Sequence, residues 1–185
     1  AEVANRYELD LLAGWQLVST PVLPYDEDIA DVFADLAQTG SVEAVVTFVW
    51  EDGQLVEKRW VPGSPISELA SFEDGQGYWV KMRSDEDLVI LGSWLPVPQG
   101  SAVPVLPSYR VYKGWNLIGF TPGSSSVASL PPVDYLGAVA DSAQAMFEYD
   151  ADAGYYVSVD YMKPGVGYWL AVSQDGTIYP GAFGA

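Results

Sequence analysis

Apolar and polar residues alternate near the start of the chain. Between residues 3 and 17 most of the apolar side chains occupy odd positions, and charged or amide side chains occupy most even ones. The odd set is Val3, Tyr7, Leu9, Leu11, Trp15 and Leu17. A period of two indicates strands with one buried face, so this stretch predicts one long strand or two in sequence.

The same alternation returns near the middle of the chain, and two motifs repeat with it. Segment 14–18 reads Gly-Trp-Gln-Leu-Val, and segment 114–118 reads Gly-Trp-Asn-Leu-Ile. Segment 75–80 reads Gly-Gln-Gly-Tyr-Trp-Val, and segment 165–170 reads Gly-Val-Gly-Tyr-Trp-Leu. These matches indicate an internal duplication with units of about 90 residues, near the size of a small domain.

Each half also predicts a short helix. In the first half, apolar residues recur at helical spacing over 29–36, directly after Asp28, which is a suitable N-cap. The shorter stretch 133–139 is its counterpart in the second half.

A hairpin follows each helix, and a final strand follows each Gly-Tyr-Trp motif. The first hairpin covers 45–61 and turns at an Asp-Gly pair, a common two-residue turn. The second covers 146–161 and turns within 150–154. The last strands are predicted at 88–91 and 177–179.

These elements predict a mostly-β protein of two homologous antiparallel β repeats, each sandwich or barrel-like and each with one short helix. Residues 1–95 form the first repeat and residues 105–185 the second. Residues 96–104 form a Pro-rich connector, which is semi-rigid because proline restricts the backbone. The pattern leaves open whether the two repeats share one core.

Charge and composition exclude several classes of function. The chain carries 25 acidic and 8 basic residues, a net charge of −17, which repels the phosphate backbone of nucleic acids. No stretch approaches the ~20 apolar residues of a membrane span. Cys and His are absent, which removes most zinc sites and nucleophilic triads. We therefore expect no enzyme and no catalytic residues.

Acidic clusters offer the only candidate cofactor, a calcium ion. Carboxylates gather at 26–28, 85–87 and 150–154, and Ca²⁺ prefers such oxygen ligands. Asp150 and Asp152 are the best candidate ligands. The alternative is local, because Asp and Gly are also the residues that turns favour.

The tryptophans of the motifs have two interpretations. If exposed, Trp15 and Trp115 would be platforms for stacking sugars. Because they share parity with Leu17 and Leu117, we expect them to face the core instead. The same interpretation applies to the tryptophans of the two Gly-Tyr-Trp motifs. Any exposed aromatic residues are expected in another group: Trp50, Trp60, Trp94, Tyr155 and Tyr156.

The Gly-Trp-Asn-Leu-Ile motif, the aromatic Asp-rich hairpin and the Gly-x-Gly-Tyr-Trp motif resemble a repeat of secreted and cell-surface proteins of bacteria and archaea. That repeat accompanies surface-layer or adhesion-type architectures. The likeness covers both halves, with departures at Gln16 and at 119–120. It implies an extracellular module with no catalytic residues. Since the chain begins with Ala1 and not with methionine, we expect a mature form whose leader peptide has been removed.

We therefore expect a non-enzymatic structural protein that self-associates as a subunit of a filament or surface layer. The alternating segment 3–11 suits addition to a neighbour's sheet, or pairing within its own repeat. The first case makes four residues candidate subunit contacts: Val3, Tyr7, Leu9 and Leu11. The alternative function is a carbohydrate-binding or adhesion module for cell-surface glycans, which requires exposed aromatic residues in line on one face.

Overall fold

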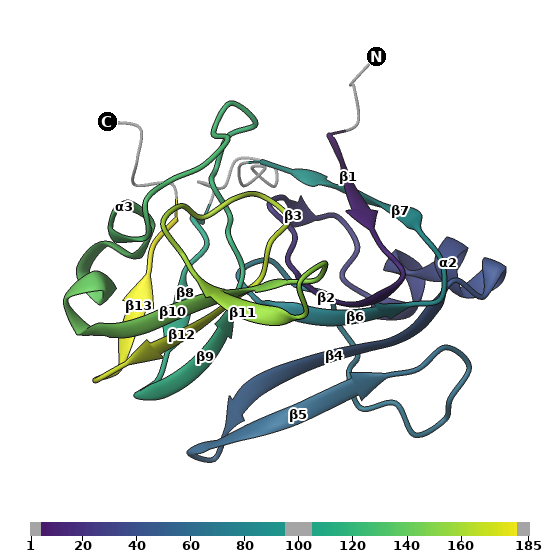
Figure 1. Cartoon of the computed structure of the whole chain (residues 1–185), viewed down its shortest axis with the longest axis horizontal. Helices are drawn as coiled ribbons and strands as arrows, with labels where there is room; N and C mark the ends of the chain where they lie inside the picture. The colour runs from purple at the N-terminus through teal and green to yellow at the C-terminus, as the bar shows by residue number, and fades with distance from the viewer. Residues whose placement is uncertain (1–4, 95–104, 181–185) are drawn as a thin grey trace.

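The computed structural model describes residues 5–94 and 105–180 (Figure 1). The first repeat comprises β1 (Arg6–Leu11), β2 (Gly14–Val18), β3 (Leu23–Pro24), α1 (Ile29–Val32), α2 (Ala34–Thr39), β4 (Val42–Glu51), β5 (Gln54–Trp60), β6 (Tyr78–Met82) and β7 (Glu86–Ser93). The second comprises β8 (Tyr109–Val111), β9 (Gly114–Ile118), α3 (Pro132–Leu136), the 3₁₀ helix η1 (Gly137–Ser142), β10 (Ala143–Asp150), β11 (Tyr155–Ser158), β12 (Tyr168–Val172) and β13 (Gly176–Ile178).

Each repeat is built on a four-stranded antiparallel sheet with the same strand order. The orders are β2-β6-β4-β5 and β9-β12-β10-β11, and both middle pairs carry an irregularity at the start of the longer strand. A smaller sheet accompanies each, β1-β7-β3 in the first repeat and β8-β13 in the second. The predicted fold class is confirmed: the protein is mostly β, antiparallel and sandwich-like, with short helices.

Local chemistry accounts for the turns and caps that the sequence predicts. The first hairpin pairs Glu51 with Gln54 around Asp52 and Gly53, whose φ angles of 50° and 78° suit the tight hairpin turn. The Asp28 carboxylate caps α1 by accepting from the N–H groups of Ala30 and Asp31. The helix of the first repeat is interrupted once, between α1 and α2.

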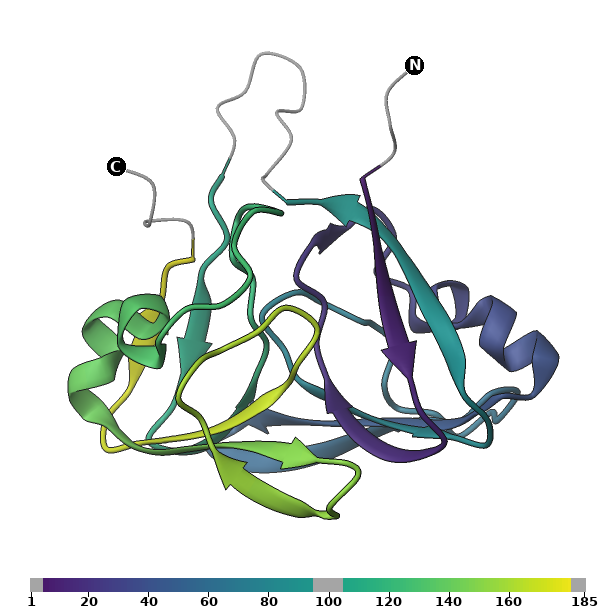
Figure 2. The same cartoon turned by 45° about the horizontal axis from the view of Figure 1, so that its top comes forward.

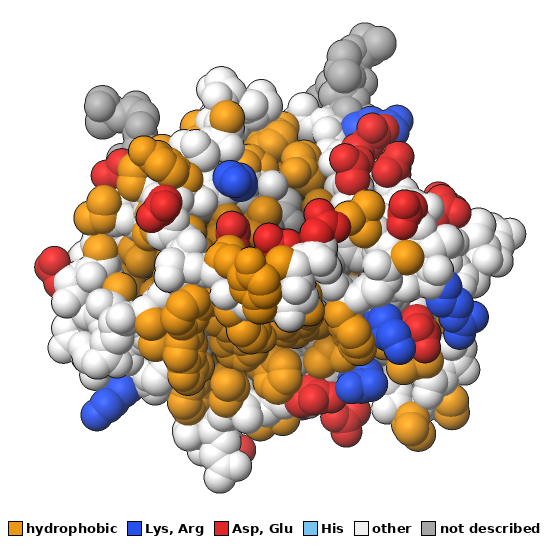
Figure 3. All heavy atoms as spheres, in the orientation of Figure 1, with side chains coloured by type: hydrophobic (Ala, Val, Ile, Leu, Met, Phe, Trp, Pro, Cys, Tyr) orange, Lys and Arg blue, Asp and Glu red, His pale blue; other side chains and the backbone are white. Residues whose placement is uncertain are grey.

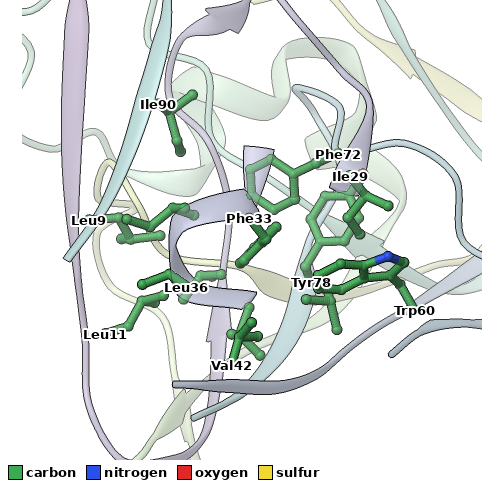
Figure 4. Close-up of a cluster of buried hydrophobic side chains, with 14 of the residues drawn as sticks. Leu9, Leu11, Ile29, Phe33, Leu36, Val42, Trp60, Phe72, Tyr78 and Ile90 are labelled. Atoms are coloured by element: carbon green, nitrogen blue, oxygen red, sulfur yellow. The ribbon is translucent and has the colours of Figure 1, made fainter. Parts of the chain in front are cut away.

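Each repeat has its own hydrophobic core, between its large sheet, its small sheet and its helices. Figure 4 shows the first core, where Phe33 and Phe72 pack with Tyr78. The second core includes Phe120 and Tyr135. Each cluster draws its residues from one repeat alone, so the repeats do not share a core. The helices lie at opposite ends of the molecule, with the large sheets between them (Figure 2).

The two repeats are joined by reciprocal backbone pairing through their Gly-x-Gly segments. The Gly77 N–H donates to the Leu117 carbonyl at 3.3 Å, and the Gly119 N–H donates to the Gly75 carbonyl at 3.0 Å. The same arrangement occurs a second time with the roles of the two repeats exchanged, so segment 165–167 pairs with segment 17–19. We call these contacts the first seam (75–77 with 117–119) and the second seam (165–167 with 17–19).

Candidate functional site

Trp15 and Trp115 face outward, which corrects the expectation that they belong to the core. They are 37% and 43% exposed. Trp15 and Leu17 do share one face of β2, but it is the face turned away from the first core. Leu17 is buried there because the other repeat covers it, through close packing against Gly167. The inward positions of β2 belong to Gln16 and Val18.

A buried amide explains this orientation. The Gln16 side chain accepts from the Leu12 N–H at 2.9 Å and donates to the Leu12 carbonyl at 2.6 Å. Asn116 makes the equivalent pair of bonds with Tyr112. These amides point toward the inside of the fold, where they bridge the bend that precedes each Gly-Trp strand. Because neighbouring side chains of a strand point to opposite faces, the adjacent tryptophan must point outward.

Aromatic side chains on these outward faces meet across the two repeats. The ring centroids of Trp79 and Tyr149 are 4.9 Å apart, and those of Phe48 and Trp169 are 5.4 Å apart. Eight ring contacts join eight side chains into one network, which we call the aromatic face: Trp15, Phe48, Trp79, Trp115, Phe147, Tyr149, Tyr156 and Trp169. Trp79 and Trp169 are half-buried within it rather than in the cores.

The aromatic face contains an apolar groove of about 460 Å³. Its lining residues are Leu55, Trp115, Phe147, Tyr156 and Trp169, none of which carries a charge. In Figure 3 hydrophobic side chains gather across the centre of the view, with charged side chains around them. Leu55 comes from the hairpin of the first repeat and the other four from the second, so both repeats build the groove.

Charged side chains lie on the first-repeat part of this surface. Arg59 and Glu57 form an exposed ion pair at 3.2 Å, and their partners across β4 are Val46 and Phe48. The corresponding positions of β11 are Ser158 and Tyr156, opposite Phe147 and Tyr149. The second repeat thus has apolar or hydroxyl side chains where the first repeat has charged ones. The groove is apolar as a result, and an ion pair lies at its border.

A second, more polar cavity of about 240 Å³ lies at the first seam. Its lining residues include Trp50, Asp74, Gln76, Tyr109, Arg110 and Tyr112. The Tyr109 hydroxyl donates to the Asp74 carboxylate and lies 3.1 Å from the Thr121 hydroxyl. Burial raises the pKa of Asp74, and the hydrogen bond from Tyr109 opposes this rise only in part. We call this cavity the seam pocket.

The candidate calcium ligands lie in the turn of the second hairpin. The Asp150 carboxylate accepts from the N–H groups of Asp152 at 3.1 Å and Ala153 at 2.9 Å. These bonds are the ones that aspartate makes in turns. Among residues 5–94 and 105–180, no group of three acidic side chains is placed to hold a metal ion. A Ca²⁺ site at Asp150 and Asp152 stays a prediction.

The candidate subunit contacts in segment 3–11 lie mostly in the first repeat's own structure. β1 pairs with β7, so the segment follows the second of its two predicted alternatives. Leu9 and Leu11 are buried in the first core, and Tyr7 packs against Trp94. Val3 lies outside the described residues. A neighbour could pair only with the outer backbone edge of β1, which is the edge strand of its sheet.

Sequence reasoning identified only part of the exposed aromatic set. Of the five residues expected to be exposed, Tyr155 and Tyr156 are exposed, while Trp60 is buried. Trp50 and Trp94 are half-buried. The available signal for the groove was the adjacent pair of tyrosines at the start of β11, which places one aromatic ring on each face of the strand.

Comparisons with protein-family models, with curated proteins and with solved structures found no match to this chain. Within the described part of the chain, no helix has the length and apolar character needed to cross a bilayer. The function is therefore inferred from the residues and their geometry.

Proposed function

We propose that the protein is a non-enzymatic extracellular structural subunit that associates with copies of itself, in a filament or surface layer, through its aromatic face. The uncharged groove of Leu55, Trp115, Phe147, Tyr156 and Trp169 carries this proposal. Interfaces between proteins are rich in aromatic residues and poor in charge at their centre, with a polar rim. The groove and its ion-paired border have this composition.

The net charge favours this surface over others for contact between copies. Each copy carries a charge of −17, so two copies repel each other over most of their surfaces. The groove is a place where they can approach without bringing carboxylates together. Exposed apolar side chains elsewhere, Val105 and Leu106, offer a complement from the next copy. Contact between two different surfaces propagates as a filament unless it closes into a ring.

A matched pair of tyrosine variants tests this proposal. Tyr156 lines the groove, whereas its neighbour Tyr155 is also exposed but lies outside it. We expect Tyr156→Glu to weaken self-association by at least about tenfold, equivalent to about 1.4 kcal/mol, because it buries a carboxylate against aromatic rings. Tyr155→Glu makes the same chemical change and should leave association unaltered.

Sedimentation equilibrium over a range of protein concentrations gives the measurement, with near-ultraviolet circular dichroism to verify the fold of both variants. A wild-type protein that stays monomeric at high concentration and moderate salt contradicts the proposal. Equal effects of the two variants would place the contact away from the groove.

Glycan binding is the second candidate function, as an adhesion module at the cell surface. The seam pocket favours it, because aromatic rings, a carboxylate, an amide and a guanidinium line one small cavity. Sugars present both apolar C–H faces and hydroxyl groups, and this mixture of side chains suits both.

A further inference from the structure

We infer that the seam pocket binds one neutral, hydroxylated ring, of the size of a single sugar residue. This inference deepens the second candidate function, glycan binding, and rests on it. The observations that carry it are the divergence of the two seams, the size of the pocket and the chemistry of its lining.

The two seams have the same backbone construction. The Tyr78 hydroxyl accepts from the Glu73 N–H at 2.7 Å, and the Tyr168 hydroxyl accepts from the Lys163 N–H at 2.6 Å. Residues 73–76 of the first seam therefore correspond to residues 163–166 of the second. In the same way, the bonds of Gln16 and Asn116 make Leu12 equivalent to Tyr112.

The side chains of the two seams differ sharply at these equivalent positions. The first seam carries Glu73, Asp74, Gln76, Tyr109, Arg110 and Tyr112, and the second carries Lys163, Pro164, Val166, Leu9, Asp10 and Leu12. A tyrosine ring packs at the glycine of each seam, Tyr109 at Gly75 and Tyr7 at Gly165. The second seam nevertheless joins the repeats without counterparts of Asp74, Gln76 and Tyr112, so the fold does not require those side chains. A ligand explains why they are present at one seam alone.

Aromatic rings form one wall of the pocket. The Trp50 and Tyr112 ring centroids are 5.9 Å apart with their planes inclined at 41°, and Tyr112 is exposed. Trp50 is held in place because its indole N–H donates to the Trp115 carbonyl at 2.9 Å. A fixed indole beside an accessible phenol ring provides an apolar surface for the C–H face of a sugar.

Polar side chains complete the pocket. The Gln76 Nε2 atom donates to the Thr47 hydroxyl at 2.7 Å and to the Phe48 carbonyl at 3.1 Å. These bonds fix the side-chain amide and involve its nitrogen but not its oxygen. Its oxygen and the carboxylates of Glu73 and Asp74 can accept from ligand hydroxyls. The volume of about 240 Å³ is below the usual range for drug-sized ligands, about 300–1,000 Å³, so it suits one ring and not a longer chain.

The charges of the lining favour a neutral ligand. Glu73 and Asp74 repel anions. Arg110 also lines the pocket, with its guanidinium 5.8 Å from the Tyr112 ring centroid and 3.7 Å from the Asp175 carboxylate. This guanidinium offsets part of the negative charge of the two carboxylates, so the lining presents charges of both signs. Hydroxyl groups can bond to both kinds of side chain.

Exchange of residues between the two seams gives the test. Wild-type protein is titrated with glucose, galactose, mannose and N-acetylglucosamine, and backbone amide shifts are followed by NMR. We expect shifts confined to the lining segments 48–50, 73–77, 108–112 and 116–118 for at least one sugar. Tyr112→Leu and Gln76→Val introduce the residues of the second seam and should each reduce affinity about tenfold or more. Leu12→Tyr, the reverse change at the second seam, should have no effect.

The possible outcomes separate this inference from the function on which it rests. If a sugar binds but shifts only residues of the aromatic face, and both seam variants bind as wild type, the pocket is refuted while glycan binding stands. If no sugar produces shifts at high millimolar concentration, both fail. A titration with tetramethylammonium forms the last arm: binding of this cation without any sugar would identify a cation site and overturn the inference.

Discussion

Asp74 is a half-buried carboxylate whose protonation is coupled to folding. Because burial raises its pKa in the folded state, it contributes stability while it is protonated, and this contribution is lost as the pH rises through the folded pKa. Asp74→Asn keeps an oxygen that accepts from the Tyr109 hydroxyl and cannot ionise. We expect the stability of this variant relative to wild type to increase as the pH rises from about 4 to about 7.

Urea unfolding at several pH values measures this difference. Tyr109→Phe is the companion variant: it removes the hydrogen bond that holds the ionised carboxylate and should make the loss of stability with rising pH steeper. Parallel pH profiles for wild type and Asp74→Asn would mean that the ionised carboxylate is well solvated at the seam.

At the scale of elements, the seam depends on close approach of backbones at Gly77. A Cβ atom there would lie 2.9 Å from the Ile118 carbonyl oxygen and 3.0 Å from Leu117 Cγ. We expect Gly77→Ala to destabilise the protein by about 1–3 kcal/mol through overpacking. Hydrogen exchange should also accelerate at the Gly119 amide, which donates across the same seam.

Gly40→Ala is the matched control for this prediction. Gly40 ends α2 at a φ of 74° and has open space around its Cα, so alanine costs backbone strain but no clash with the seam. Its expected cost is about 1–2 kcal/mol, without faster exchange at Gly119. Unchanged exchange at Gly119 in Gly77→Ala would show that the seam adjusts to the methyl group.

Elements governed by local chemistry could be predicted from the sequence, and those governed by long-range contact could not. The turn at Asp52 and the cap at Asp28 follow from nearby residues. The outward orientation of Trp15 does not follow from nearby residues, because both faces of β2 are partly buried. The core covers one face, and Gly167 of the second repeat covers part of the other. The odd or even position of a residue along a strand identifies which residues share a face. It does not identify which of two apolar faces meets the core.

The seam pocket shows the same limit. Its polar residues come from two segments about a fifth of the chain apart, and only the reciprocal pairing of the Gly-x-Gly motifs brings them together. Each motif by itself indicates only a turn that enters a strand. The duplication was therefore visible in the sequence, whereas the way that its halves interlock was not.

For the whole molecule, the excess of acidic residues predicts how salt and pH act together. The net charge of −17 produces repulsion within one chain and between copies. Because the Debye length falls from about 30 Å at 0.01 M to about 10 Å at 0.1 M salt, added NaCl screens this repulsion. We expect the melting temperature to rise with NaCl, and self-association through the uncharged groove to strengthen.

Mild acid should act in the same direction as salt. Burial raises the pKa of Asp74 and Glu148, so each contributes stability that is lost as the pH rises through its folded pKa. Melting curves at two pH values and several NaCl concentrations separate the two causes: salt removes the part due to repulsion, and the part due to burial persists. A melting temperature and an association constant that both fall with NaCl would indicate that ion pairs such as Arg59–Glu57 outweigh repulsion, and would move the proposed contact from the groove to its charged border.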